Sequence, residues 1–293
     1  MRIPVGDHSH RGIRNNGGLT EDQYNSIMDR IQSLFGDVVK QRGGTLVINR
    51  LWTDDTVNSS AEQQGNQWII NMYGGIARHP DITYEGEALV ACHEMGHHLG
   101  GAPKEGGLGG AWATDEGGAD YFATLKCLRE FFAKDDNGTV VASSQIDPLV
   151  TKNCEAQFKS ESDQLICKRI SLSAESVSYL FQDLSQESTR PRFDTPDTSQ
   201  VNTTNDDHPA TQCRMDTYFN GAICHVDVSV PNSDTDFKAG ACVQGVDDVG
   251  FRPRCWFQPN PPSGGGGGSS CPLGDPTICQ EACQIMPQLP FCQ

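Results

Sequence analysis

The sequence predicts an α+β fold in which a small, mostly antiparallel sheet packs on helices. An amphipathic repeat covers residues 20–41, where apolar side chains recur at helical spacing. Two short runs follow, TLVINRLW at 45–52 and QWIINMY at 67–73, and their β-branched and aromatic residues favour strands. Helical patterns resume at 84–99 and at 115–133. We expect these helices to cover the sheet.

The first helix has a clear start and a clear end. Thr20 and Gln23 are spaced as a capping box, and the Gly43-Gly44 pair ends the helical pattern. The polar stretch 53–66 between the two strands is expected to be a loop. Gly74 and Gly75 then turn the chain into a short segment at 76–79.

The second half of the chain is expected to extend the same domain with helices. Residues 151–186 look helical, with an interruption near Ser171–Ser173. The polar, Pro-containing stretch 187–206 predicts a long loop. A further helix is expected to start near Pro209, because proline suits the first turn of a helix.

Composition divides the chain into four parts. Residues 1–18 are polar and are interpreted as a mobile arm, and 19–258 as one folded domain. The segment PNPPSGGGGGSS at 259–270 is typical of a flexible linker. It leads into a tail, 271–293, whose four cysteines predict a small module held by its own disulfides.

Charge and cysteine content narrow the class of protein. The chain has 22 basic and 38 acidic residues, which argues against nucleic-acid partners and anionic membrane surfaces. No apolar run reaches the ~18 residues of a transmembrane segment. Twelve cysteines, an even number, favour disulfides and an oxidising compartment. A secreted or periplasmic protein is therefore expected, although the first residues show no apolar signal segment. The oligomeric state cannot be predicted.

The segment His93-Glu94-Met95-Gly96-His97 is an HExxH motif on a predicted helix. Residues four apart lie on the same helix face, so the imidazoles of His93 and His97 can bind one metal ion. Glu94 lies beside that face, where its carboxylate can reach a water on the metal.

The third ligand decides the class of site. In the pattern HExxHxxGxxH, Gly100 fits the glycine, but Pro103 stands at the last histidine and cannot bind a metal. The alternative is a carboxylate from the following helix, either Glu116 or Asp120. These two are again four apart, so one can bind the metal while the other accepts a hydrogen bond from a ligand histidine. The small residues at 117–119 would let the two helices approach closely.

Three ordered motifs resemble those of a known family. HEMGH, then EGGAD, then DHPATQCR at 207–214 are similar to HExxH, ExxAD and HPxxxxR in the gluzincin metallopeptidases of the prenyl-protease and HtpX-like group, including minigluzincins. GGIARHP and GEALVACHE before them also resemble that family's edge strand and active-site helix. The resemblance implies a zincin-like (gluzincin) core in 19–258, with a helical extension and a Cys-rich tail. Residues 128–206 and 225–293 have no counterpart in the family.

The resemblance also implies roles for individual residues. A zinc ion would be held by two histidines and a glutamate, a second glutamate would be the general base, and a later histidine would donate to the oxyanion. An aspartate would orient a ligand histidine, and an arginine would hold that region. In this sequence the zinc ligands are His93, His97 and Glu116, the catalytic residues Glu94 and His208, and the supporting residues Asp120 and Arg214.

The expected function is a zinc-dependent endopeptidase that hydrolyses a peptide or protein substrate through a metal-activated water. The strand 67–73 is expected to pair with extended substrate, with Trp68, Met72 and Gly75 as contacts. Whether Trp68 and Met72 face the core or the substrate stays open. Two alternatives also stay open: a binding protein on a metallopeptidase scaffold that contacts partners through loops or the tail, and a latent enzyme blocked by His208 or by the loop 187–206.

Overall fold

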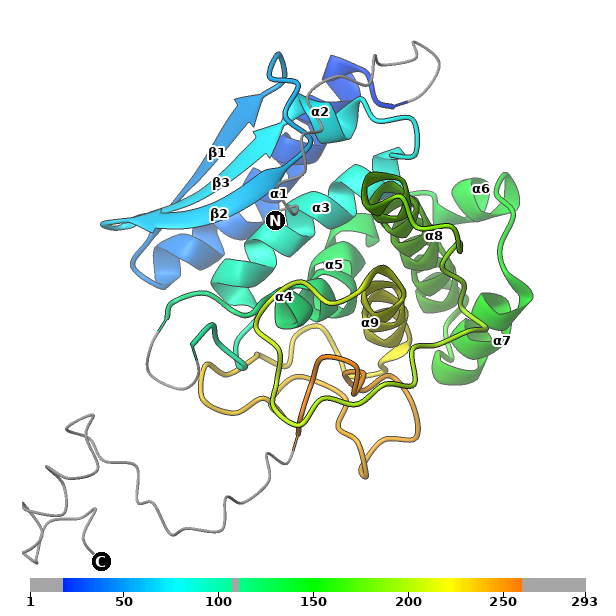
Figure 1. Ribbon diagram of the computed structural model, residues 1–293. Helices are drawn as coiled ribbons and strands as arrows, with labels where there is room; N and C mark the ends of the chain where they lie inside the picture. The colour runs from blue at the N-terminus through cyan, green and yellow to red at the C-terminus, as the bar shows by residue number, and fades with distance from the viewer. Residues whose placement is uncertain (1–17, 107–110, 260–293) are drawn as a thin grey trace, which may run out of the picture. The chain divides into compact units, whose positions relative to one another are not determined.

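A three-stranded sheet packs against two helices in the computed structural model, which describes residues 18–106 and 111–259 (Figure 1). The strands β1 (Thr45–Leu51), β2 (Ser59–Gln64) and β3 (Gln67–Tyr73) lie in the order β1-β3-β2. β1 runs parallel to β3, and β2 runs antiparallel to it. The sheet is therefore mixed, not mostly antiparallel, because the chain crosses from β1 to the far edge before it turns back into β3.

β2 lies where the sequence predicted a loop. Its residues SSAEQQ lack the apolar run typical of a strand, because β2 is an edge strand with small or polar side chains. β3 fills the centre of the sheet and is paired on both sides. The expectation that substrate pairs with 67–73 is therefore wrong, since both edges of that strand are already hydrogen-bonded.

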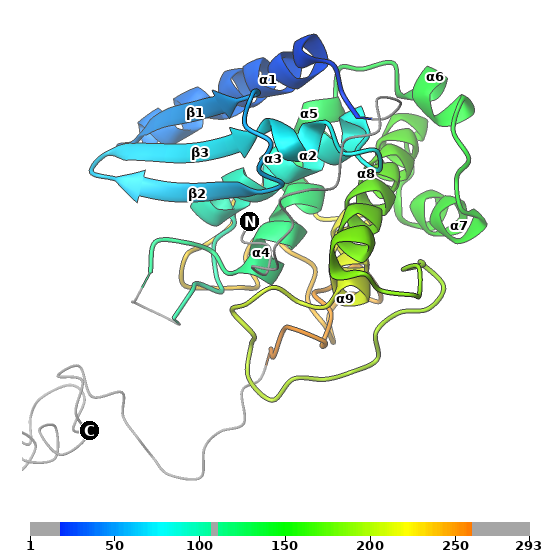
Figure 2. The same cartoon turned by 45° about the horizontal axis from the view of Figure 1, so that its top comes forward.

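The helices α1 (Glu21–Gln41) and α3 (Tyr84–Leu99) contact the sheet (Figure 2). α1 begins at the predicted capping box of Thr20 and Gln23 and buries an apolar stripe that includes Ile27 and Ile31. α3 is buried from Gly86 onward, since α1, the sheet and α8 (Glu161–Ser185) all contact it. The short helix α2 (Gly74–Ala77) connects β3 to this layer.

Further helices pack against α3 or α8. A continuous helical run is made of three segments: α4 (Glu116–Phe122), the π-helical η1 (Ala123–Cys127) and α5 (Leu128–Phe132). The remaining helices besides α8 are α6 (Asn137–Ala142), α7 (Pro148–Gln157) and α9 (Thr211–Ile223). Within the described ranges, no helix combines the length and the apolar character that a membrane crossing requires.

The interruption expected near Ser171–Ser173 is wrong. The chain breaks earlier, between α7 and α8, where the Ser160 side chain caps α8. Inside α8 the hydroxyls of Ser171 and Ser173 instead donate to backbone carbonyls four residues back, at 3.1 and 3.4 Å. Serine is compatible with a helix interior when its hydroxyl bonds back in this way.

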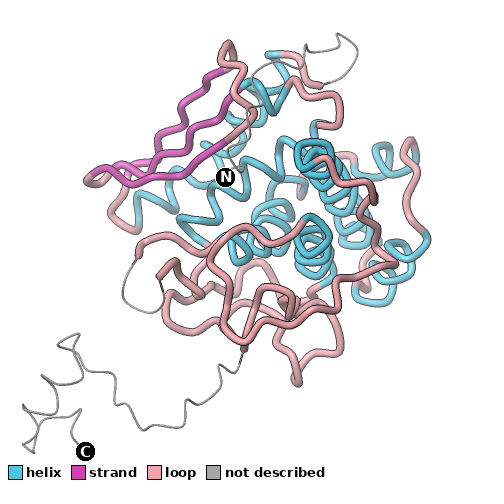
Figure 3. The backbone as a smooth tube through the Cα atoms, viewed as in Figure 1, coloured by secondary structure: helices cyan, strands magenta, loops and turns pink. Residues whose placement is uncertain are grey.

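Disulfides hold the loop-rich end of the described chain. Residues 225–259 form no helix or named strand (Figure 3). Two disulfides tie this segment to α9 or to the residue that directly follows it, and two others join helices. The four pairs are Cys92–Cys127, Cys154–Cys167, Cys213–Cys255 and Cys224–Cys242. They confirm the expectation of disulfides. The expected arm, linker and Cys-rich tail lie outside the described residues, apart from Gly18 and Pro259 at their borders.

Candidate metal centre

The structure brings the two histidines of the HExxH motif to one carboxylate. His93 and His97 lie one turn apart on α3, and their side chains are buried. Glu116 begins α4, with Asp115 as its N-cap, and its Oε2 atom lies 3.1 Å from His93 Nε2 and 3.7 Å from His97 Nε2. One ligand atom from each of the three residues lies within 4.8 Å of the other two. This group can therefore hold a metal ion.

The spacing of these atoms fits a tetrahedral metal. Ligand atoms about 2.0–2.2 Å from zinc lie about 3.3–3.6 Å from one another at tetrahedral angles, close to the separations seen here. Both ring nitrogens of His93 and Glu116 Oε2 are also buried without a well-aligned hydrogen bond among the described residues. Buried polar atoms are rarely left in this state unless a further partner completes them.

The other ring nitrogens of both histidines face supporting groups. His93 Nδ1 lies 2.7 Å from Asp120 Oδ1, and His97 Nδ1 lies 2.8 Å from the carbonyl oxygen of Thr114. An imidazole that donates from Nδ1 presents the lone pair of Nε2 on its opposite side. Both histidines are thus oriented with Nε2 toward Glu116.

Asp120 is held in turn by an arginine from α9. Arg214 donates to both carboxylate oxygens of Asp120, at 2.8 and 2.7 Å, and both residues are buried. Burial would raise the pKa of Asp120, but Arg214 and His93 outweigh it and hold this pKa below its usual value. Asp120 therefore stays ionised and can accept a hydrogen bond from His93.

The charges around the histidines favour a cation. Burial lowers the pKa of His93, but Asp120 and Glu116 outweigh burial and raise it to about 9. Burial would raise the pKa of Glu116, whereas the neighbouring imidazoles of His208 and His93 hold it well below its usual value. A positive charge between these carboxylates is therefore stabilised, as a bound metal ion would be.

Small residues let the two ligand helices approach each other. A Cβ atom on Gly96 would lie 2.7 Å from the carbonyl oxygen of Ala119, so the HExxH helix needs glycine there. Gly117 serves a different contact from the one expected, since a Cβ on it would lie 2.3 Å from the ring of Trp256, not against α3. A disulfide also joins the two helical segments, since Cys92 precedes His93 and Cys127 ends η1.

The two expected catalytic residues both lie near this cluster. Glu94 is buried and accepts a 2.5 Å hydrogen bond from the Ser59 hydroxyl of β2. His208 precedes α9, and its Nδ1 atom lies 3.0 Å from Glu116 Oε2. The residues that the HExxH, ExxAD and HPxxxxR motifs contain are therefore gathered in one place.

A cleft of about 720 Å³ opens beside the cluster. His97, Glu116 and His208 contribute to its lining, together with side chains of β2, β3 and two loops. A cleft of this volume is large enough for a bound peptide segment or small molecule.

The three expected substrate contacts do not line this cleft. Side chains alternate along β3, so Trp68 and Met72 point toward the helices, while Asn71 between them lines the cleft. Trp68 stacks on His98 at 5.4 Å, and Met72 is buried. Gly75 packs against backbone, where a Cβ atom would lie 2.3 Å from the Asp55 carbonyl oxygen. These residues have structural roles in the sheet and at its end.

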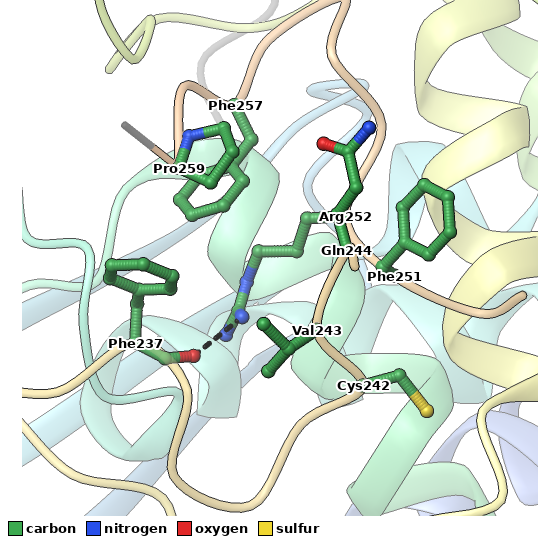
Figure 4. Close-up of a pocket in the computed structure, with 8 residues that line it drawn as sticks. All are labelled: Phe237, Cys242, Val243, Gln244, Phe251, Arg252, Phe257 and Pro259. Carbon is green, nitrogen blue, oxygen red and sulfur yellow. Dashed lines mark hydrogen bonds between the residues drawn. The ribbon is translucent and has the colours of Figure 1, made fainter. Parts of the chain in front are cut away.

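A second hollow lies around Arg252, far smaller than the cleft (Figure 4). Arg252 donates to the Phe237 carbonyl oxygen at 2.8 Å, and Phe257 packs near it. The hollow has a volume of about 10 Å³, which is room for about one water molecule. It is therefore no substrate site.

Other groups of metal-ligand side chains in the described ranges are weaker. One group contains Cys213 and Cys255, and another contains Cys242. All three sulfurs are in disulfides. A disulfide sulfur has no thiolate to offer a metal. A third group contains His79, whose Nδ1 atom already accepts a hydrogen bond from the backbone N–H of Asp81.

Sequence reasoning missed two residues that contact the side chains of this centre. Thr114 acts through its backbone carbonyl, which any residue would supply, so its side chain gives no signal. Ser59 lies in the polar strand that was expected to be a loop. The serine becomes visible only when β2 is placed beside α3.

Comparison with protein-family models, with curated proteins and with solved structures found no match to this chain. The resemblance to gluzincins therefore stays a prediction from three motifs.

Proposed function

We propose that the protein is a zinc-dependent endopeptidase of gluzincin type. The observation that carries the proposal is the convergence of His93 Nε2, His97 Nε2 and Glu116 Oε2 next to a cleft, with Glu94 on the same helix. The four disulfides further support a secreted or periplasmic location.

Zinc is the metal that this donor set favours. Two imidazoles and one carboxylate are typical of catalytic zinc sites, which keep a fourth position open. When bound, zinc would polarise the peptide carbonyl and lower the pKa of water. A site closed by four protein ligands would suit a structural role instead.

The chain's own residues would move protons and hold the substrate. Glu94 would take a proton from the attacking water and pass it to the leaving amine, while Ser59 fixes its carboxylate. His208 would donate toward the oxygen that gains negative charge. β2 is an edge strand that contributes to the cleft wall, so its backbone can pair with an extended peptide.

A cleavage assay with casein and a quenched fluorescent peptide tests this proposal. Cleavage is measured with chelator present and again after zinc is added back. Hydrolysis should depend on zinc, and Glu94→Gln should reduce kcat by about 10²–10⁴-fold because the proton acceptor is lost. The variant should still bind zinc, since Glu94 is no ligand. Unchanged cleavage by Glu94→Gln would refute the mechanism.

Two results would favour the alternatives. If no substrate is cleaved and removal of zinc unfolds the protein, the metal has a structural role and a binding protein is the better assignment. If cleavage appears only in His208→Ala, the enzyme is latent and His208, which lies 3.0 Å from Glu116 Oε2, blocks the site.

A further inference from the structure

Arg252 carries a buried positive charge without an acidic partner. The residue is 5% exposed, and no carboxylate in the described part of the chain forms an ion pair with it. Arginine is almost never buried this deeply unless it is paired, because a charge loses its hydration in the interior. The charge of this guanidinium therefore lacks a full counterpart.

The hydrogen bonds of the guanidinium are also incomplete. Nη1 donates to the Phe237 carbonyl oxygen at 2.8 Å, and Nη2 lies 3.4 Å from the Ala102 carbonyl oxygen. The Nε atom of Arg252 is buried and has no hydrogen-bond partner among the described residues. Buried donors in folded proteins are nearly always paired, with protein, water or an ion. The Nε–H group therefore calls for an acceptor that the chain does not supply.

The neighbours of the guanidinium compensate its charge only in part. Its Cζ atom lies 4.7 Å from the ring centroid of Tyr121 and 5.5 Å from that of Phe257. Aromatic faces attract a cation, but they carry no net charge. Asp115 acts on Arg252 through its charge without forming an ion pair, and its Oδ1 atom accepts a hydrogen bond from the Gly118 N–H.

The hollow beside Arg252 has the size of one small ion. Its volume is about 10 Å³, and most of its lining is apolar, including Phe237, Val243 and Phe257. Figure 4 shows the Arg252 side chain extending across this group of residues toward Phe237. None of the described residues that line the hollow is acidic. A guanidinium that faces a small apolar hollow is therefore left open to an anion from solution.

We infer that this hollow binds a chloride ion, which accepts the hydrogen bond of Arg252 Nε–H and balances the guanidinium charge. Hydrogen bonds between ionised groups are stronger than those between neutral groups. Chloride is only slightly larger than water, so it fits a hollow in which sulfate, phosphate or a carboxylate does not. A water molecule would complete Nε but would leave the charge uncompensated, and is therefore the rival occupant.

The ion would stabilise a junction between three parts of the chain. Arg252 belongs to the segment 225–259, reaches Ala102 in the loop after α3, and lies over the ring of Tyr121 in α4. The backbone N–H of Ala102 also donates to the Ser233 carbonyl oxygen of that segment, at 2.7 Å. The site exists only where these parts are assembled, so chloride should bind the folded state and raise its stability.

Thermal unfolding in matched sodium salts tests the site in the full-length protein. Calorimetry is done in chloride, bromide or gluconate at equal ionic strength, so that screening is the same. Chloride at about tenfold its Kd should raise Tm by about 3–6 °C over gluconate, and the rise should saturate. Bromide should act similarly, whereas gluconate is too large to enter. Equal Tm values in the three salts would overturn the inference.

Two variants assign the effect to the buried arginine. Arg252→Met keeps a side chain of similar length but removes the charge and the Nε–H donor, so the chloride effect on Tm should disappear. Arg192→Met is the matched control, because the Arg192 side chain is 63% exposed and does not line the hollow. This control should keep the full chloride effect. Equal effects in both variants would mean that chloride acts elsewhere.

Diffraction locates the ion without any substitution. Crystals of the wild-type protein grown in sodium bromide should give an anomalous peak in the hollow next to Arg252 Nε. An ordered water there without such a peak, or bromide bound only at other places, would overturn the inference. None of these measurements depends on zinc or on cleavage, so the inference stands or fails separately from the proposed peptidase function.

Discussion

The disulfide between Cys92 and Cys127 should stabilise the fold and the metal centre together. Cys92 directly precedes the expected ligand His93 on α3, and Cys127 ends the π-helical segment that continues α4, which begins with Glu116. The bond therefore joins the two helical segments that carry the expected ligands. Replacing both cysteines by alanine would leave these helices held only by packing and hydrogen bonds.

The stabilisation expected from each disulfide follows from the number of residues in the loop that it closes. A separation of 35 residues between Cys92 and Cys127 corresponds to about 4 kcal/mol of chain-entropy stabilisation. The buried pair Cys154–Cys167 closes 13 residues and corresponds to about 3 kcal/mol. For a domain of this size these values predict losses of about 8–16 °C and about 6–12 °C in Tm.

The two double alanine variants differ in what else they should change. Both should lose Tm by similar amounts in thermal unfolding followed by circular dichroism. Only the variant that lacks Cys92–Cys127 should also bind zinc about 10-fold more weakly, measured by competition with a chromophoric chelator, because its ligand helices are no longer tethered. Equal zinc affinities in the two variants, or a Tm loss below about 2 °C for Cys92–Cys127, would refute this reasoning.

Three further substitutions test other contacts. Ser59→Ala removes the hydrogen bond to the Glu94 carboxylate and should lower kcat about 10-fold with little change in KM, measured with a quenched peptide; an unchanged kcat would exclude a positioning role. Burial raises the pKa of Glu87 in α3 to about 8, above its unfolded value, so this group stabilises the fold below about pH 4.5 and loses that contribution as pH rises to about 8. Glu87→Gln should therefore flatten the pH dependence of urea unfolding between pH 5 and 9, and an unaltered slope would contradict the assignment. Gly96→Ala places a Cβ 2.7 Å from the Ala119 carbonyl oxygen and should reduce zinc affinity and Tm together, whereas an unaffected variant would show that α4 can move away freely.

The elements with local signals could be predicted from sequence. The capping box and the apolar stripe placed α1 within one residue of its observed start, and α3 was predicted with its observed bounds. β2 could not be predicted, because an edge strand with polar and small residues lacks an apolar alternation. The expected edge pairing of substrate with β3 was wrong for the same reason, because β2 occupies the second side of β3.

The candidate metal centre was predictable where spacing on a helix fixes geometry. His93 with His97, and Glu116 with Asp120, are pairs four residues apart, and such pairs share a helix face wherever the helix packs. The cleft was not predictable, since Asp206 reaches Gly106 across one hundred residues of chain. Contacts between distant loops depend on tertiary packing that no local pattern encodes.

The residues that hold the expected metal ligands in place are separate from the acidic residues that line the cleft. Arg214 and Asp120 are buried and act on the imidazole of His93, away from the cleft lining. Glu105 and Asp206 line the cleft and are absent from the contacts that orient the ligand histidines. Substitutions at distant sites without shared partners have nearly additive effects. Changes in the first set should therefore alter the affinity for zinc, whereas changes in the second set should leave it unchanged.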